Sequence, residues 1–199
     1  LRRYVHIAYK KAEQMRDLVE DLFEYTQSQD AQLLNVRDFS VVTMVEQLGL
    51  DYQLEAKRHG LTIEVTVSDP NLHMVGDVLK LGRVLTNLIN NAFRYAEGAH
   101  HLWLTASQEQ HNIVLTVAND GAPIPREKIA YIFDRFYRGD PSRSAITGGS
   151  GLGLAIAKNI VSMHGGEISV TSNDEITRFV LVLPQNMTHS LQAQRYVNK

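Results

Sequence analysis

The sequence predicts an α+β fold: a two-layer α/β sandwich in which one helical layer covers a mostly antiparallel mixed sheet. Apolar and polar residues alternate, as in half-buried strands, at 61–67, 102–106, 113–117, 168–171 and 179–183. Segments with apolar residues at helical spacing separate these strands. The resulting order mixes hairpins with helices, so it does not have the repeated strand–helix–strand pattern of a doubly wound sheet.

Composition limits the classes of protein that fit. The chain has 199 residues, of which 44% are hydrophobic and 21% charged, with a net charge of −2, which is typical of a globular protein and not of a basic nucleic-acid-binding one. It contains no cysteine, and no apolar run approaches the ~18 residues that a membrane span needs. Because Leu1 already lies within a helical pattern, we expect the chain to be a fragment of a longer protein.

Residues 1–30 predict one long helix with a heptad seam. Charged residues occupy its other faces, and the seam consists of small or apolar residues spaced alternately by four and three: Leu1, Val5, Ala8, Ala12, Met15, Val19, Leu22 and Thr26. Four consecutive heptads favour packing against another helix, although a single surface helix docked on the main domain is the alternative. A polar linker follows at 31–37.

The main domain is predicted to cover residues 38–185. It begins with a short strand at 39–42 and a helix that starts near Val45 and ends at His59-Gly60, where Gly60 suits a C-cap. The strand at 61–67 and a short strand at 73–75 follow. Asp77 then suits the N-cap of an amphipathic helix that runs through Tyr95.

The second half of the domain is predicted to contain two hairpins and two helices. The first hairpin pairs 102–106 with 113–117, and the last pairs 168–171 with 179–183 and ends at Pro184. Between them lie a short helix at 129–137 and a helix at 151–164 that is closed by Gly165-Gly166. Residues 186–199 have no pattern and are expected to form a loose tail.

The central helix carries a first block of polar residues. Asn87 and Asn91 are four residues apart, so their amides share one face, bordering the apolar stripe. Arg94 adds a cation and Tyr95 an aromatic tip. Amide oxygens suit a hard cation such as Mg²⁺, and an arginine suits phosphate. A helix at the edge of the core whose amides bind neighbouring backbone is the alternative.

Two further blocks follow in the chain. Residues 117–125 place Asn119-Asp120-Gly121 directly after a strand, where an amide or carboxylate can accept a hydrogen bond from a ligand's amine, although a plain turn explains this block equally well. Residues 148–154 are glycine-rich and open a helix, which favours an anion. Their spacing matches neither a dinucleotide fingerprint nor a P-loop. The polar residues 139–147 have the composition of a mobile lid, with Arg138 at its hinge.

The order of the three blocks, together with Ile132-Phe133-Asp134-Arg135-Phe136-Tyr137-Arg138, resembles the catalytic ATP-binding domain of sensor histidine kinases. This is the GHKL or Bergerat fold, shared with Hsp90, gyrase B and MutL, and the resemblance covers about residues 38–185. Residues 1–30 resemble the second helix of the kinases' dimerisation and phosphotransfer hairpin.

The resemblance implies a function. ATP, with Mg²⁺, would give its γ-phosphoryl group to a His on a missing helix, and a response regulator Asp would receive it next. The parent protein would be a homodimer through the full hairpin, and this chain the cytoplasmic portion of a membrane-anchored sensor.

The resemblance also implies roles for individual residues. Asn91 would bind Mg²⁺ with support from Asn87, and Asn87, Arg94 and Arg138 would be the catalytic positions around the phosphates. The other nucleotide contacts would be Tyr95, Asn119, Asp120, Gly121, Ile124, Gly149, Gly151, Leu152, Gly153 and Leu154. Relatives that hydrolyse ATP have a Glu general base where this chain has Asn87, so hydrolysis should be slow.

The chain departs from the family pattern in two places. Members of the family usually bind the adenine amine with an Asp at the position of Asn119. Because an amide has no charge, adenine binding should be weaker by roughly 1 kcal/mol in this chain. Whether Asn119 or the neighbouring Asp120 binds the base is open. Pro123 replaces a second glycine, a form that is similar to that of some sensor kinases, vancomycin-resistance sensors among them. No His has the context of a phosphoacceptor, so we expect no autophosphorylation by this chain alone.

Two other functions are weighed against the kinase. A degenerate, non-catalytic dimerisation or docking module is favoured by Asn119. A chaperone- or topoisomerase-type ATPase is disfavoured by Asn87.

Overall fold

The computed structural model describes residues 34–139 and 150–186, together with scattered residues between positions 4 and 26. The scattered residues are helical, but the helix predicted over 1–30 as a whole lies outside the described residues. Of the tail predicted over 186–199, only Asn186 is described, and it pairs with Val75 in an isolated β-bridge instead of being loose. The elements in chain order are β1 (Arg37–Ser40), α2 (Val41–Arg58), β2 (Thr62–Val67), β3 (His73–Gly76), α3 (Val78–Tyr95), β4 (His101–Glu109), β5 (Asn112–Asn119), α4 (Arg126–Ile129), α6 (Gly153–Met163), β6 (Glu167–Ser172) and β7 (Thr177–Pro184).

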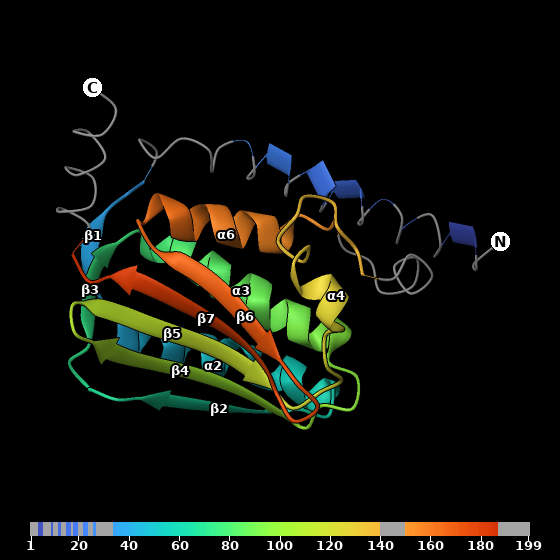
Figure 1. Cartoon of the computed structure of the whole chain (residues 1–199), viewed down its shortest axis with the longest axis horizontal. Helices are drawn as coiled ribbons and strands as arrows, with labels where there is room; N and C mark the ends of the chain where they lie inside the picture. Colours follow the sequence, from blue (N-terminus) through green and yellow to red (C-terminus); the bar gives the residue numbers. More distant parts are fainter. Residues whose placement is uncertain are drawn as a thin grey trace.

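Five strands form one sheet in the order β2-β4-β5-β7-β6, and the longer helices lie against it (Figure 1). Strand β2 is parallel to β4, and every other pair of neighbours in this sheet is antiparallel. Strands β1 and β3 form a separate antiparallel pair. The predicted two-layer sandwich with a mostly antiparallel mixed sheet is therefore confirmed.

The core lies between the sheet and the helices α2, α3 and α6. Strand β5 shows the alternation on which the prediction rested, because Ile113, Leu115 and Val117 are buried while the residues between them are partly exposed. Helix α3 contributes buried residues at helical spacing: Leu81, Val84, Leu85, Leu88, Ile89 and Ala92. None of the helices in the described residues is long and apolar enough to cross a membrane.

The first helix begins earlier than predicted. Ser40 is its N-cap, and the Ser40 hydroxyl accepts a hydrogen bond from the Thr43 amide at 3.2 Å. The strand predicted at 39–42 therefore ends at Ser40, and Val41 and Val42 belong to α2. A β-branched pair favours a strand locally, but the capping serine places it in the first helical turn.

The helix predicted over 129–137 is wrong. Helix α4 covers Arg126–Ile129, starting after Pro125, and turns follow it. Pro125 has the fixed φ that suits a helix start. Phe136 has a φ of 58°, a left-handed conformation that an α-helix of L-residues cannot continue.

A buried hydrogen-bond chain fixes the start of α3. The Asp77 carboxylate caps the helix by accepting from the Leu79 and Lys80 amides, both at 3.1 Å. The Asp77 amide in turn donates to Nε2 of His164 at 3.0 Å. Nδ1 of His164 lies 2.8 Å from the Ile160 carbonyl, to which it donates. His164 therefore fits in its neutral form, with the proton on Nδ1.

Burial lowers the pKa of His164 below its ordinary value of 6.5, so stability should depend on pH. Below pH 6.5 the unfolded chain takes up a proton that folded His164 resists. The free energy of unfolding should therefore fall as the pH is lowered from about 7.5 to about 5.5, as measured by urea unfolding. His164→Gln keeps an acceptor without a titrating group and should flatten this dependence. His111→Gln, at an exposed position, should keep it; a wild-type pH dependence in His164→Gln would contradict the assignment.

Candidate functional site

A pocket of about 560 Å³ lies between α3, the segment after β5, α4 and the start of α6. Its volume falls within the range of small-molecule sites. Its charged lining residues in the described part of the chain are all cationic, with no Asp or Glu among them: Arg83, Arg94, Lys128 and Arg138. This charge distribution suits an anionic ligand.

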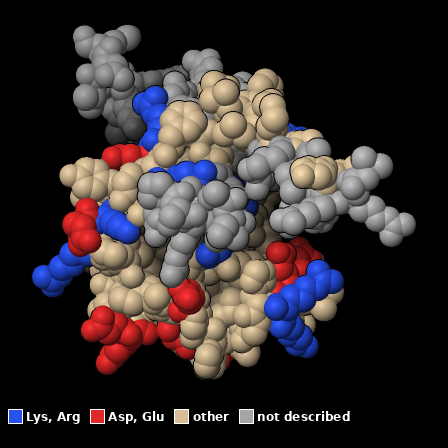
Figure 2. Space-filling view, turned by 90° about the vertical axis from the view of Figure 1, so that its right-hand side faces the viewer, with Lys and Arg blue, Asp and Glu red and all other residues tan. Residues whose placement is uncertain are grey.

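Figure 2 shows the end of the molecule that carries α4. Several Lys and Arg side chains lie near the centre of this face, whereas most Asp and Glu side chains lie toward its lower part. Among the described residues of this nearly neutral chain, none of the Asp and Glu residues lines the pocket.

Helix α3 forms one wall of the pocket. Asn87 and Asn91 line it, as their helical spacing predicts, and Asn90 lines it as well. Nδ2 of Asn87 donates to the carbonyl of Gly153 at 3.1 Å. The donor side of this amide is therefore engaged with α6, and its oxygen Oδ1 is the atom left to bind a ligand or cation.

The glycine-rich block meets the phenylalanine-rich block at Gly151. Gly151 has a φ of 73°, and a Cβ there would lie 2.9 Å from the carbonyl carbon of Phe136 and 3.1 Å from the carbonyl oxygen of Tyr137. Only glycine fits both the conformation and the space. The next residue, Leu152, is fully buried and anchors the loop to the core.

The third part of the pocket is the end of β5. Asn119 is 4% exposed, and its Oδ1 accepts from the Gly121 amide at 3.1 Å. A Cβ on Gly121 would lie 2.7 Å from the backbone of Ala96, so this glycine allows the turn to pack directly on the end of α3. The Ala122 amide donates to the Glu97 carbonyl at 2.9 Å and closes the same contact.

Asp120 is engaged elsewhere. Its Oδ1 accepts from the amides of His100 and His101, both at 2.8 Å, and its Oδ2 lies 3.0 Å from Nδ1 of His101. Burial opposes ionisation of this carboxyl, but these hydrogen bonds outweigh it and lower the pKa of Asp120 to about 2. Its carboxylate therefore joins the end of β5 to the start of β4.

Most of the residues predicted for the site lie together. The predicted residues that line the pocket are Asn87, Asn91, Arg94, Tyr95, Asn119, Ile124, Arg138, Gly151, Gly153 and Leu154. Gly121 and Leu152 are buried and support the loops beside it, whereas Asp120 is not among the lining residues. Gly149 lies outside the described residues.

Sequence reasoning missed several polar lining residues, among them Arg83, Lys128 and Thr177. Arg83 precedes Asn87 by one helical turn, so the spacing used for Asn87 and Asn91 could have found it. Lys128 and Thr177 come from α4 and β7 and have no local signal, because only the tertiary fold brings them to α3.

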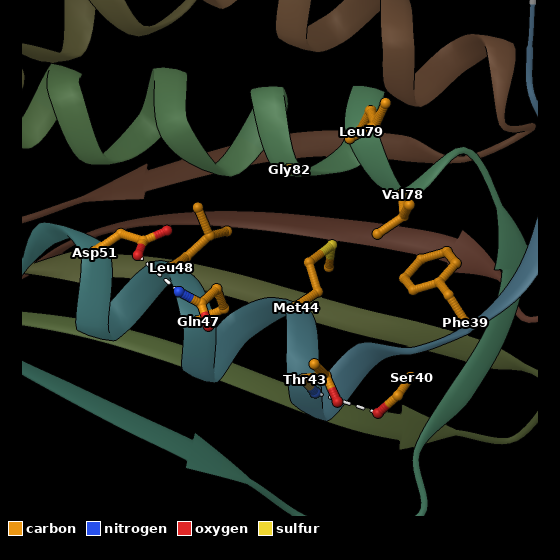
Figure 3. Close-up of a pocket in the computed structure, with 10 residues that line it drawn as sticks. All are labelled: Phe39, Ser40, Thr43, Met44, Gln47, Leu48, Asp51, Val78, Leu79 and Gly82. Atoms are coloured by element: carbon orange, nitrogen blue, oxygen red, sulfur yellow. Dashed lines mark hydrogen bonds between the residues drawn. The ribbon is translucent and has the colours of Figure 1, made fainter.

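A second hollow, of about 420 Å³, lies between the first turns of α2 and α3 (Figure 3). Phe39, Met44 and Val78 contribute apolar side chains, and Gln47 donates to Asp51 at 2.7 Å along the rim. Asp51 is the only charged residue among those that line it. This hollow therefore lacks the cations and the clustered amides of the first pocket.

The donor set of the first pocket suits a divalent cation only in part. No group of three or more His, Cys, Asp or Glu side chains that could hold a metal occurs among the described residues. The pocket instead offers the amide oxygens of Asn87 and Asn91 beside cationic side chains. A Mg²⁺ ion would fit there together with the phosphates of a ligand, whose oxygens complete its coordination.

Comparison with known proteins agrees with this geometry. Residues 76–187 match the family described as histidine kinase-, DNA gyrase B-, and HSP90-like ATPase. The sensor protein VanS of Enterococcus faecium is 36% identical over 183 residues, which are 92% of this chain and 47% of VanS. The sensor histidine kinase CusS of Escherichia coli K12 is 35% identical over 171 residues, which are 85% of this chain and 35% of CusS.

The chain thus spans about half or less of the length of these relatives. Among solved structures, full-length ShkA in complex with AMPPNP superposes with a TM-score of 0.80 at 25% identity, over 92% of this chain and 38% of ShkA. The matched family, the similarity to these sensor proteins and the confirmed sandwich lead to one conclusion. The chain belongs to the histidine kinase-, DNA gyrase B- and HSP90-like ATPase family.

Proposed function

We propose that this chain is the ATP-binding catalytic part of a two-component sensor histidine kinase. The observation that carries the proposal is the pocket whose charged lining residues are all cationic and which opens onto the glycine-rich start of α6. The relatives named as a sensor protein and a sensor histidine kinase support it, as does the solved complex of ShkA with AMPPNP.

The triphosphate would lie at the end of the pocket formed by α6 and the arginines. Arg138 and Arg94 would form charge-assisted hydrogen bonds with phosphate oxygens. The backbone around Gly151 and Gly153 approaches the same space, because neither residue has a side chain to fill it. These groups bind and orient the nucleotide.

The magnesium ion that we propose would be held by the oxygens of Asn87 and Asn91 together with phosphate oxygens. When bound, Mg²⁺ neutralises part of the charge on the phosphates. The hydrogen bond from Asn87 to Gly153 fixes which end of that amide faces the ion. An amide cannot take a proton from water, so these residues bind the nucleotide without promoting its hydrolysis.

In the proposed parent protein, a His outside this chain accepts the γ-phosphoryl group and passes it to an Asp of a response regulator. The parent would be a homodimer and membrane-anchored, with this chain on its cytoplasmic side. The alternative function is that of a degenerate docking module. Asn119 favours this alternative, because an amide lacks the negative charge of the Asp that usually binds adenine in the family. The two functions differ in whether the pocket binds nucleotide.

Calorimetric titration with the ATP analogue AMPPNP, with and without Mg²⁺, tests the proposal. We expect saturable one-to-one binding whose affinity changes with Mg²⁺. A folded sample that shows no binding at millimolar nucleotide would favour the docking module.

Replacing Arg138 should weaken nucleotide binding through the loss of a phosphate contact. Arg138→Ala should raise the Kd for AMPPNP by roughly 10- to 100-fold, the range for a charge-assisted hydrogen bond. Adenosine, which has no phosphate, should bind both proteins equally. Arg126→Ala removes an exposed arginine that does not line the pocket and is the matched control. Equal loss in both variants would mean that only the general charge matters.

Replacing Asn91 should separate the effect of the metal from that of the nucleotide. Asn91→Ala should abolish most of the change in AMPPNP affinity that Mg²⁺ causes, because the variant lacks an oxygen ligand. The affinity without Mg²⁺ should change less, by under about tenfold. Asn112→Ala, at the far end of β5, is the control. An undiminished Mg²⁺ effect in Asn91→Ala would remove Asn91 from the metal site.

A further inference from the structure

We propose that the base subsite accepts 6-oxopurine nucleotides, such as ITP and GTP, as well as ATP, because Asn119 presents a hydrogen-bond donor to the base. This inference rests on the proposed nucleotide-binding function and adds the class of base that the site takes. It follows from the orientation of one amide, from its surroundings and from the chemistry of purines.

The orientation of the Asn119 amide follows from its partner. A backbone N–H can only donate, so the atom of Asn119 that lies 3.1 Å from the Gly121 nitrogen must be the oxygen Oδ1. The opposite orientation would place two donors against each other at a buried position. The hydrogen bond therefore decides which end of the amide is the nitrogen.

The nitrogen Nδ2 of Asn119 is the end of this amide that remains open to a partner. Among the described residues it has no hydrogen-bond partner, and it is not one of the fully enclosed side-chain atoms without a partner. It therefore keeps access to solvent, and Asn119 lines the pocket. The group that Asn119 offers to a ligand is an N–H donor.

Asn119 lies at the end of the pocket where α3 ends. Ala96, Ala122 and Thr177 line it, and Thr177 lies opposite Asn119 in the register of β5 and β7. Along α3, Ala96 is nine residues beyond Asn87, or about 13 Å at the rise of an α-helix. The base would therefore bind at this end while the phosphates bind near Asn87 and Arg138.

An amide and a carboxylate form different hydrogen bonds with the group at position 6 of a purine. An ionised Asp is only an acceptor, so it accepts from the 6-amino group of adenine and repels the 6-oxo group of guanine or hypoxanthine. The Nδ2 donor of Asn119 pairs instead with an acceptor, which adenine provides at N1 and a 6-oxopurine at O6. One donor thus serves both classes of base.

The hydroxyl of Thr177, which is paired with Asn119 across the sheet, also does not distinguish the two classes of base. The hydroxyl of Thr177 lies 2.6 Å from that of Ser172, whose oxygen also accepts from the Ile124 amide. A hydroxyl can donate or accept, so Thr177 does not restore the selectivity of a carboxylate. The carboxylate of the adjacent residue, Asp120, is bound to His100 and His101.

The test compares the Kd values of ATP and ITP by calorimetry for the wild type, Asn119→Asp and Asn112→Asp. ITP has the 6-oxo group, with its protonated N1, but lacks the 2-amino group of guanine, so it reports on the 6-oxo edge of the base without a contribution from position 2. We expect the wild-type ratio of Kd for ITP to Kd for ATP to stay within about tenfold, and Asn119→Asp to raise it by about tenfold or more. Asn112→Asp makes the same chemical change at the other end of β5 and should leave the ratio unchanged.

The outcomes separate this inference from the proposed function. A wild-type ratio above tenfold, or a ratio that Asn119→Asp leaves unchanged, would overturn the inference while leaving ATP binding intact. Binding of neither nucleotide by the folded wild type would overturn the proposed function itself. The wild-type ratio decides the first point even if Asn119→Asp fails to fold.

Discussion

The pocket depends on the way in which α3 and α6 are held against each other. At one end, the buried chain from Ile160 through His164 to Asp77 joins the end of α6 to the start of α3. At the other end, the Asn87 amide donates to the carbonyl at the start of α6. Two ties, about 15 Å apart along α3, fix both the position and the rotation of these helices. Because the Asn87 amide itself makes one tie, the ligand-binding wall and the packing of the core are parts of one arrangement.

The electrostatics of the site come from the distribution of charges and not from their sum. The chain has a net charge of −2, yet the charged residues that line the pocket are all cationic. A concave surface with low-dielectric walls strengthens such a local potential, which raises the concentration of polyanions at its mouth. The carboxylate of Asp120 does not weaken this potential from within the pocket. Asp120 is adjacent to Asn119 in the chain, but its hydrogen bonds to the start of β4 hold it outside the pocket lining.

The sequence predicts the parts of the structure whose patterns are local. The strands follow from alternation, and α3 follows from apolar spacing after the Asp77 cap, so Asn87, Asn91 and Arg94 could be placed on one wall. The prediction of a helix at 129–137 was wrong. The apolar spacing there is compatible with a helix, but the segment forms turns, and the backbone of Phe136 is left-handed. Lys128 and Thr177 could not be predicted, since only the packing of α4 and β7 brings them to the pocket.

The contact at Gly151 has a consequence for the length of the chain between residues 137 and 151. Gly151 packs against the backbone of Phe136 and Tyr137, so the two ends of this segment lie close together. Its ends are therefore already closed by the fold, and the entropy of closure grows only with the logarithm of its length, about 0.6 kcal/mol for each doubling. Insertions or deletions between these two ends should therefore change the free energy of unfolding little. The length of this segment can thus vary independently of the domain's stability.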